Sequence, residues 1–249
     1  MVKDSPSSYH SDKKDSKNNA EVYKKITDLP FRYLAYRDLP DIIRRYIKGK
    51  DSLDFGCGTG ISTQFLVNQG FSVTAVDSNE EMIKEAKIYC PLALYWNTRD
   101  PLYLSNLKLY DLVFSSFVLF ELSTETDINT YLSGAKELLK EDGVLIAITG
   151  SQYMYSKNWI CFKSMYEDKH NFKSGDKVKI FLPGPDIEFT DYYWIEEDYK
   201  RFFKKAGFIL NEIYYPLGKD TDPFVWKDEK IYSPFVILVA QADQNFNAQ

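Results

Sequence analysis

A glycine-rich turn that follows an apolar run constrains the fold of this chain most. Residues 51–60 read Asp-Ser-Leu-Asp-Phe-Gly-Cys-Gly-Thr-Gly, with glycine at three alternate positions. Glycine adopts positive φ and lets a ligand come close to the backbone, and a helix start offers free N–H groups. The stretch therefore predicts a strand, a turn and a helix that together cradle a nucleotide-like ligand.

The glycine spacing counts against two other nucleotide-binding loops. The dinucleotide fingerprint needs its third glycine at position 61, where this chain has Ile61. A phosphate-gripping P-loop ends in Gly-Lys-Ser or Gly-Lys-Thr, and that ending does not follow here. An NAD-dependent oxidoreductase thus stays only as a rival interpretation.

A second apolar run, residues 71–77, ends in Asp77. This acid follows the first glycine by about 20 residues, the spacing at which α/β units place a carboxylate on ribose hydroxyls. Ser78 or Asn79 is expected to cap the next helix, which has two glutamates in its first turn. The alternative is that Asp77 itself is only a helix cap.

The glycine turn and the Val-Asp-Ser-Asn-Glu-Glu-Met stretch at 76–82 together resemble the first two motifs of the class I S-adenosylmethionine-dependent methyltransferases. The resemblance implies an α/β, Rossmann-like fold: a seven-stranded, mostly parallel sheet with helices on both faces and the strand order 3-2-1-4-5-7-6. It also implies S-adenosylmethionine as cofactor. An N-terminal helical lid and an aromatic-rich cap insertion complete the expected architecture.

Strand-like and helix-like segments alternate from residue 51 onward, which favours such a sheet. Expected strands are 52–55, 72–77, 93–96, 109–114, 143–149, 209–215 and 234–240. Expected helices are 60–69, 79–88, 125–140 and 195–206.

The remaining segments define the expected domain organisation. Residues 1–19 are polar with little to bury, so we expect a disordered tail. Residues 20–249 are expected to form one methyltransferase domain. Within it, residues 151–194 are too long for a plain connection and rich in aromatic residues. We expect this segment to form a cap over the carboxyl ends of the strands, where α/β sheets bind ligands.

The resemblance also implies cofactor contacts. Asp54 would lie near the cationic amino group of the methionine moiety, and Asp77 would accept from the ribose diol. Arg37 precedes the glycine turn, where the family often has a lid residue, and arginine suits the cofactor carboxylate. The adenine contact is open between Thr98 and Asp100; we choose Asp100, which could also be a simple turn residue. The expected cofactor-binding set is Arg37, Asp54, Gly56, Cys57, Gly58, Gly60, Asp77, Ser78, Met82, Asp100, Ser116 and Phe117.

Two residues are expected to be catalytic. Glu121 follows the fourth expected strand and would act as a base or orient the acceptor, with a surface position as the alternative. Tyr153 belongs to the cap, and some of Tyr153, Tyr155, Trp159, Tyr192 and Tyr193 are expected to line a mostly apolar acceptor pocket. The expected reaction is in-line methyl transfer to an O, N or C atom of a small, planar or aromatic acceptor.

Composition narrows the class of protein further. The net charge is -5 and no basic face is visible, which argues against nucleic acid as partner. The three cysteines lack metal-ligand spacing, so no metal is expected. No apolar run approaches the roughly 18 residues of a membrane span, and we expect a cytoplasmic protein. An RNA- or protein-directed methyltransferase and a non-catalytic cofactor-binding module remain alternatives, and the sequence leaves the acceptor and the oligomeric state open.

Overall fold

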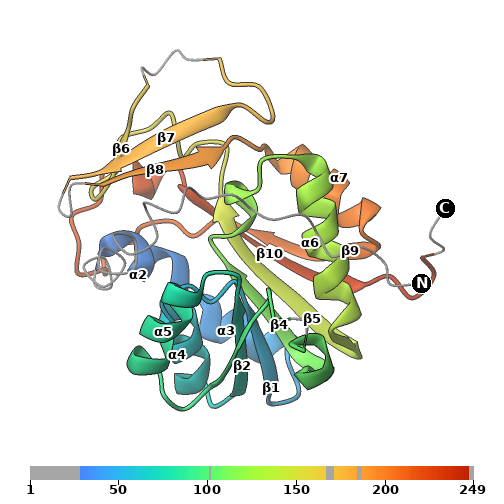
Figure 1. Ribbon diagram of the computed structural model, residues 1–249. Helices are drawn as coiled ribbons and strands as arrows, with labels where there is room; N and C mark the ends of the chain where they lie inside the picture. Colours follow the sequence, from blue (N-terminus) through green and yellow to red (C-terminus); the bar gives the residue numbers. More distant parts are fainter. Residues whose placement is uncertain (1–28, 101, 167–170, 184–186, 247–249) are drawn as a thin grey trace.

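The structure is a computed structural model that describes residues 29–100, 102–166, 171–183 and 187–246 (Figure 1). Its centre is a seven-stranded sheet with the order β3-β2-β1-β4-β5-β10-β9. Strands β1 to β5 pair in parallel, and β10 lies antiparallel between β5 and β9. The strands are β1 (Asp51–Phe55), β2 (Ser72–Asp77), β3 (Leu94–Asn97), β4 (Tyr110–Ser116), β5 (Leu139–Gly150), β9 (Phe208–Tyr214) and β10 (Phe235–Ala242). This arrangement confirms the predicted fold and strand order. The tail expected at 1–19 lies outside the described residues.

Helices lie on both faces of this sheet (Figure 1). They are α2 (Pro30–Tyr36), α3 (Leu39–Tyr46), α4 (Ile61–Asn68), α5 (Glu80–Tyr89), α6 (Glu125–Glu137) and α7 (Glu196–Lys205). Short 3₁₀ turns are η1 (Leu104–Asn106), η2 (Leu119–Glu121) and η3 (Asp228–Lys230). Within the described ranges, none of the helices has the length and apolar content to cross a membrane.

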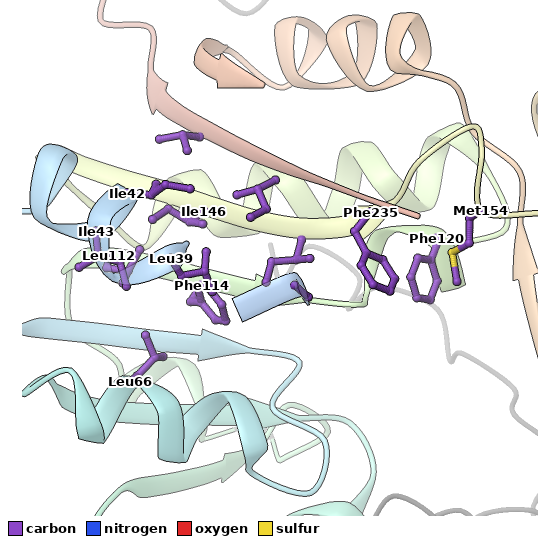
Figure 2. Close-up of a cluster of buried hydrophobic side chains, with 14 of the residues drawn as sticks. Leu39, Ile42, Ile43, Leu66, Leu112, Phe114, Phe120, Ile146, Met154 and Phe235 are labelled. Atoms are coloured by element: carbon purple, nitrogen blue, oxygen red, sulfur yellow. The ribbon is translucent and has the colours of Figure 1, made fainter. Parts of the chain in front are cut away.

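The core follows the alternation of side chains along the central strands. Phe114 of β4 packs with α3 and α4 on one face of the sheet, and its neighbour Val113 packs with α6 and α7 on the other. Figure 2 shows the first of these clusters, in which three residues of α3 lie over the sheet. The labelled members from α3 are Leu39, Ile42 and Ile43. This packing fixes α3, which follows α2 in the chain.

The fifth strand begins earlier than predicted. The expectation was a helix to residue 140 and a strand from residue 143, whereas α6 ends at Glu137 and β5 begins at Leu139. Leu139 pairs with Tyr110 of β4, and the register then shifts between Tyr110 and Leu112. An irregularity of this kind lengthens a strand but interrupts the alternation of its side chains. The additional residues therefore show no strand pattern in the sequence.

The insertion at 151–194 contains a second, antiparallel sheet with the order β6-β7-β8. Its strands are β6 (Lys163–Ser164), β7 (Lys177–Leu182) and β8 (Ile187–Tyr192). Trp159 and Phe162 are buried in the same cluster as the main sheet, and the indole of Trp194 donates to the Leu122 carbonyl at 3.3 Å. The expectation that Trp159 lines an acceptor pocket is therefore wrong, because its ring is a core residue of the fold.

Candidate functional site

The glycine turn after β1 has the backbone that its sequence predicts. Gly56, Gly58 and Gly60 have φ angles of 86°, 51° and 88°, a region that residues with side chains rarely adopt. A Cβ on Gly60 would come within 3.0 Å of the backbone of α5, so this glycine allows α4 and α5 to pack. A Cβ on Gly58 would meet no protein atom within 4 Å. The turn therefore presents an open backbone face at Gly58.

Asp54, near the end of β1, carries a carboxylate that is only half satisfied. The residue is 0% exposed. Its Oδ2 accepts from the hydroxyls of Ser62 at 2.7 Å and Thr63 at 2.6 Å, both at the start of α4. Its Oδ1 is buried without a hydrogen-bond partner. Burial is the largest cause that raises the pKa of Asp54 to about 7, and a buried acceptor without a donor is costly.

Asp77, at the end of β2, ties the glycine turn to α5. Its Oδ2 accepts from the Gly58 N–H at 2.9 Å and its Oδ1 from the Asn79 N–H at 2.8 Å. Burial raises the pKa of Asp77 although these N–H donors act against it. Asn79 caps α5, since its Oδ1 accepts from the Glu81 N–H at 3.0 Å. Of the two predicted caps, Ser78 and Asn79, the structure has Asn79, and the alternative that Asp77 is the helix cap is wrong.

The end of β4 carries a strained residue. Phe117 has φ 62°, the positive value that is unusual for a residue with a side chain. Its ring lies 6.1 Å from that of Phe31 on α2 and 5.2 Å from that of Phe235 on β10. Beside it, the Ser116 hydroxyl bonds the Tyr36 hydroxyl at 2.6 Å. The end of β4 is thus covered by α2.

Two acids approach each other between η2 and the insertion. Glu121 is the last residue of η2. It is exposed to solvent, although other protein atoms lie around its carboxyl group. Desolvation by these neighbouring protein atoms, and then the negative charges of Asp191 and Asp77, raise its pKa to about 8. Asp191 of β8 is buried and accepts from the Tyr155 hydroxyl at 3.1 Å. Burial raises the pKa of Asp191 to about 7, and β8 packs directly against η2.

Other predicted site residues lie around these groups. Cys57 and Met82 are buried beside the glycine turn and in the first turn of α5, and burial raises the pKa of the Cys57 thiol. Ser78 is half-buried, and its backbone N–H contributes to the Asp77 carboxylate. Tyr153 follows β5, with its ring 5.0 Å from that of Tyr232. These positions surround the ends of β1, β2, β4 and β5.

Arg37 does not lie where the sequence analysis expected it. Its guanidinium donates to Asp222 at 2.6 Å, to Asp38 at 2.7 Å and to the Leu217 carbonyl at 2.9 Å. These acceptors take up the donors that a cofactor carboxylate would need. The clamp hypothesis for Arg37 therefore does not fit the geometry. The reason is the helical phase, because Arg37 lies one turn after Tyr33 on a face of α2 that meets the connection between β9 and β10.

The adenine candidates occupy different positions. Asp100 is exposed, and its Oδ1 accepts from the Leu102 N–H at 2.9 Å, as a turn residue does. Thr98 is half-buried, and its N–H donates to the Asp77 carbonyl at 2.9 Å. The position next to Asp77 favours Thr98, and either adenine contact stays a prediction.

Sequence reasoning missed two acids. Asp191 sits in a short strand of the insertion, and Asp222 lies on the connection between β9 and β10. Each acid is a candidate only because of hydrogen bonds to residues far away in the chain. Asp191 accepts from Tyr155, and Asp222 accepts from Tyr33 and Arg37. No local pattern carries such information. Over the described stretches, no cluster of three or more His, Cys, Asp or Glu residues is arranged to hold a metal ion.

Comparisons with known proteins agree with this geometry. A family model described as "Methyltransferase domain" matches residues 53–143. A protein named as a methyltransferase in Geobacillus sp. (strain WCH70) is 28% identical over 190 residues, which are 66% of this chain and 76% of the relative. The ubiquinone biosynthesis O-methyltransferase of Pelagibacter ubique (strain HTCC1062) is 24% identical over 41% of this chain and 43% of its own length.

A solved structure extends the likeness to nearly the whole chain. The S-adenosylmethionine-dependent methyltransferase from Clostridium acetobutylicum ATCC 824 superposes with a TM-score of 0.60 and 20% identity, covering 91% of this chain and 98% of that one. At this identity the likeness shows a common fold. The family model covers the segment from β1 to the start of β5, which holds the glycine turn, Asp54 and Asp77. Residues 53–143 therefore match a methyltransferase domain, and the chain as a whole has the fold of a solved S-adenosylmethionine-dependent methyltransferase.

Proposed function

We propose that this protein transfers the methyl group of S-adenosylmethionine to a small molecule bound between the end of β4 and the insertion at 151–194. The observation that carries the proposal is the buried Oδ1 of Asp54, which has no protein partner. It lies in the segment that matches the methyltransferase family model, two residues before the turn whose face at Gly58 is open.

The residues around the turn suit the cofactor. The cationic amino group of S-adenosylmethionine would satisfy Asp54 Oδ1 and remove the cost of its burial. Asp77 would keep its two backbone donors and accept from the ribose hydroxyls with its remaining lone pairs. The backbone at Gly58 would pass close to the ligand without steric conflict. When bound, the cofactor supplies a methyl group that its sulfonium already activates.

This chain then has to align the acceptor and exclude water. The rings of Phe31, Phe117 and Phe235 form an apolar layer at the end of β4, and α2 covers it through the bond between Tyr36 and Ser116. Dry surroundings strengthen electrostatic interactions and hold the reacting atoms in line. Most of the required catalysis is therefore positional.

Glu121 is the proposed base or orienting group for the acceptor. Glu121 is exposed, ends the short turn η2 that comes after β4, and is influenced by the charges of Asp191 and Asp77. Desolvation and the charges of Asp191 and Asp77 raise the pKa of Glu121. Burial raises the pKa of Asp191, and the hydrogen bond from the Tyr155 hydroxyl acts in the opposite direction. Such a site suits an acceptor that donates a hydrogen bond through a hydroxyl or amine group. Tyr153 would add an aromatic wall with a polar tip.

Titration calorimetry tests the cofactor half of this proposal. The purified protein is titrated with S-adenosylmethionine, S-adenosylhomocysteine and NAD. We expect both sulfur compounds to bind and NAD to show no heat of binding. Binding of NAD without binding of S-adenosylmethionine would remove the proposal in favour of an oxidoreductase.

A further inference from the structure

Asp222 gathers hydrogen bonds from two separate parts of the chain. Its side chain is only 3% exposed. From α2 it receives the Tyr33 hydroxyl at 3.0 Å and Arg37 Nη1 at 2.6 Å. From its own connection it receives Trp226 Nε1 at 2.9 Å and the Lys219 N–H at 2.8 Å. A single carboxylate thus joins α2 to the segment between β9 and β10.

The aromatic rings around Asp222 reinforce this junction. The Tyr33 ring lies 5.2 Å from the Phe224 ring and 6.4 Å from the Trp226 ring. The Arg37 guanidinium lies 5.9 Å from the centre of the Tyr33 ring. Burial alone would raise the pKa of Asp222, but the donors around it bring that pKa below its ordinary value. The carboxylate is therefore ionised at neutral pH, as a partner of Arg37 should be.

The next face of α2 points to the candidate cofactor site. Tyr36 follows Arg32 by one turn, as Arg37 follows Tyr33, so the two pairs lie on adjacent faces of the helix. The Tyr36 hydroxyl bonds Ser116, and the charges of Arg32 and Asp54 both influence the pKa of Tyr36. Tyr36 therefore lies near the acid proposed to bind the cofactor amino group.

Helix α2 has little stability of its own. It has seven residues, and its N-cap residue, Leu29, provides no side-chain hydrogen bond. Isolated helices of this length do not persist in water. Its position must come from the contacts of its side chains, and the bonds to Asp222 are the charged, buried part of those contacts.

We propose that Asp222 is a positioning residue that holds α2 as a lid over the cofactor site, so that S-adenosylmethionine binding depends on the contacts of Asp222 with Tyr33 and Arg37. This inference rests on the proposed function. Asp222 does not touch the cofactor in this account. It acts through the helix, by keeping the Tyr36 face in place at Ser116 and Asp54.

The substitution Asp222→Asn tests the proposal because it keeps the size of the side chain and removes its charge. If the loss of the ion pair lowers the fraction of closed lid to about a tenth, affinity for S-adenosylmethionine falls about tenfold. Calorimetry measures the dissociation constant. Hydrogen exchange of the amides of residues 30–37, without ligand, should show faster exchange in this variant.

Matched variants separate positioning from general stability. Asp220→Asn changes an exposed acid of the same connection that pairs with Lys230, and it should leave the dissociation constant unchanged. Tyr33→Phe removes one donor and should give a smaller shift in a protein that folds normally. In a double-mutant cycle, the effects of Arg37→Ala and Asp222→Asn on the dissociation constant should sum to more than the effect of the double variant, because the ion pair between them is lost only once.

The outcomes separate the two claims. Wild-type protein that binds S-adenosylmethionine while Asp222→Asn binds it equally well overturns the lid role, even if the melting temperature falls. Equal losses in Asp222→Asn and Asp220→Asn overturn it too. Wild-type protein that fails to bind S-adenosylmethionine instead overturns the proposed function, and the inference with it.

Discussion

At the scale of single residues, Asp54 and Asp77 show how one residue type serves two purposes. Asp77 is surrounded by backbone donors that hold the turn and α5 in place. Asp54 has one satisfied oxygen and one buried oxygen without a donor. The first arrangement stabilises the fold, whereas the second costs stability until a donor arrives. A residue that binds a ligand is expected to cost folding stability in this way.

The first prediction separates these effects at Asp54. Its folded-state pKa is raised to about 7, so its contribution to stability is full below the ordinary pKa of an aspartate and is lost as pH rises towards 7. At pH 8, Asp54→Asn should therefore melt no lower than wild type. It should nevertheless bind S-adenosylmethionine roughly tenfold to hundredfold more weakly, since a charge-assisted hydrogen bond contributes about 1.5–3 kcal/mol.

Calorimetry and a melting curve check this prediction together. Asp51→Asn is the matched control, because Asp51 lies at the other end of β1 and pairs with Lys108 and Lys140. Unchanged affinity in Asp54→Asn would contradict the role given to Asp54.

The second prediction concerns Glu121. A base works in its ionised form, and the pKa of Glu121 is raised to about 8. The methyl-transfer rate should therefore rise with pH through about 8 in the free enzyme and level off above it. The Glu121→Gln variant should lose this rise, while Glu125→Gln, an exposed residue paired with Arg201, should keep it. A pH profile of kcat/KM decides the matter, and a rise that persists in Glu121→Gln would assign it to another group.

At the scale of elements, the glycine turn was predicted and the β6-β7-β8 sheet was not. Three glycines before a helix predict a turn by themselves, because glycine is the residue that readily adopts the positive φ angles such a turn requires. The second sheet is built from short strands, one of two residues, that pair across the insertion. Such pairing depends on distant partners rather than on local periodicity. The prediction that Arg37 binds the cofactor carboxylate failed for a similar reason. Only the packed helix shows that the Arg37 side chain meets Asp222.

The third prediction uses two glycines of similar backbone. Gly58→Val and Gly70→Val both place a branched residue at positive φ, and Gly70 lies at the far end of α4 with only the Lys50 side chain within 4 Å. Each should cost about 1–2 kcal/mol of folding free energy. Only Gly58→Val should abolish cofactor binding, because the added atoms fill the open face of the turn. Denaturant melts and calorimetry on both variants test this, and equal affinities would place the cofactor elsewhere.

The fourth prediction divides the aromatic residues of the insertion. Trp159 is buried with its indole bonded to the Met154 carbonyl at 2.7 Å. Trp159→Ala should therefore lower the free energy of unfolding by about 3–5 kcal/mol. Tyr153 is half-buried near the end of β5, so Tyr153→Ala should reduce turnover with little change in cofactor affinity. If Tyr153→Ala loses cofactor affinity and stability together, the residue is part of the core and not of the acceptor site.

At the scale of the whole molecule, the alternation of strands and helices predicts a mostly parallel sheet with helices on both faces. The strand order and the inserted antiparallel β10 that the structure has were implied by the family resemblance and not by periodicity. The site needs side chains from β1, β2, β4, η2, α2 and the insertion at once. Asp54 could be named from its motif, but its partners Ser62 and Thr63, and the approach of Asp191 to Glu121, depend on tertiary packing.

The central claim is that a small molecule accepts the methyl group, and one labelling experiment tests it most directly. The protein is incubated with S-adenosylmethionine labelled in its methyl group and a cell extract, and the extract is then separated into protein, nucleic acid and small-molecule fractions. The account predicts label in the small-molecule fraction with the wild-type protein and far less with Asp54→Asn. Label that enters only the protein or nucleic acid fraction, or the same labelling by both variants, would contradict it.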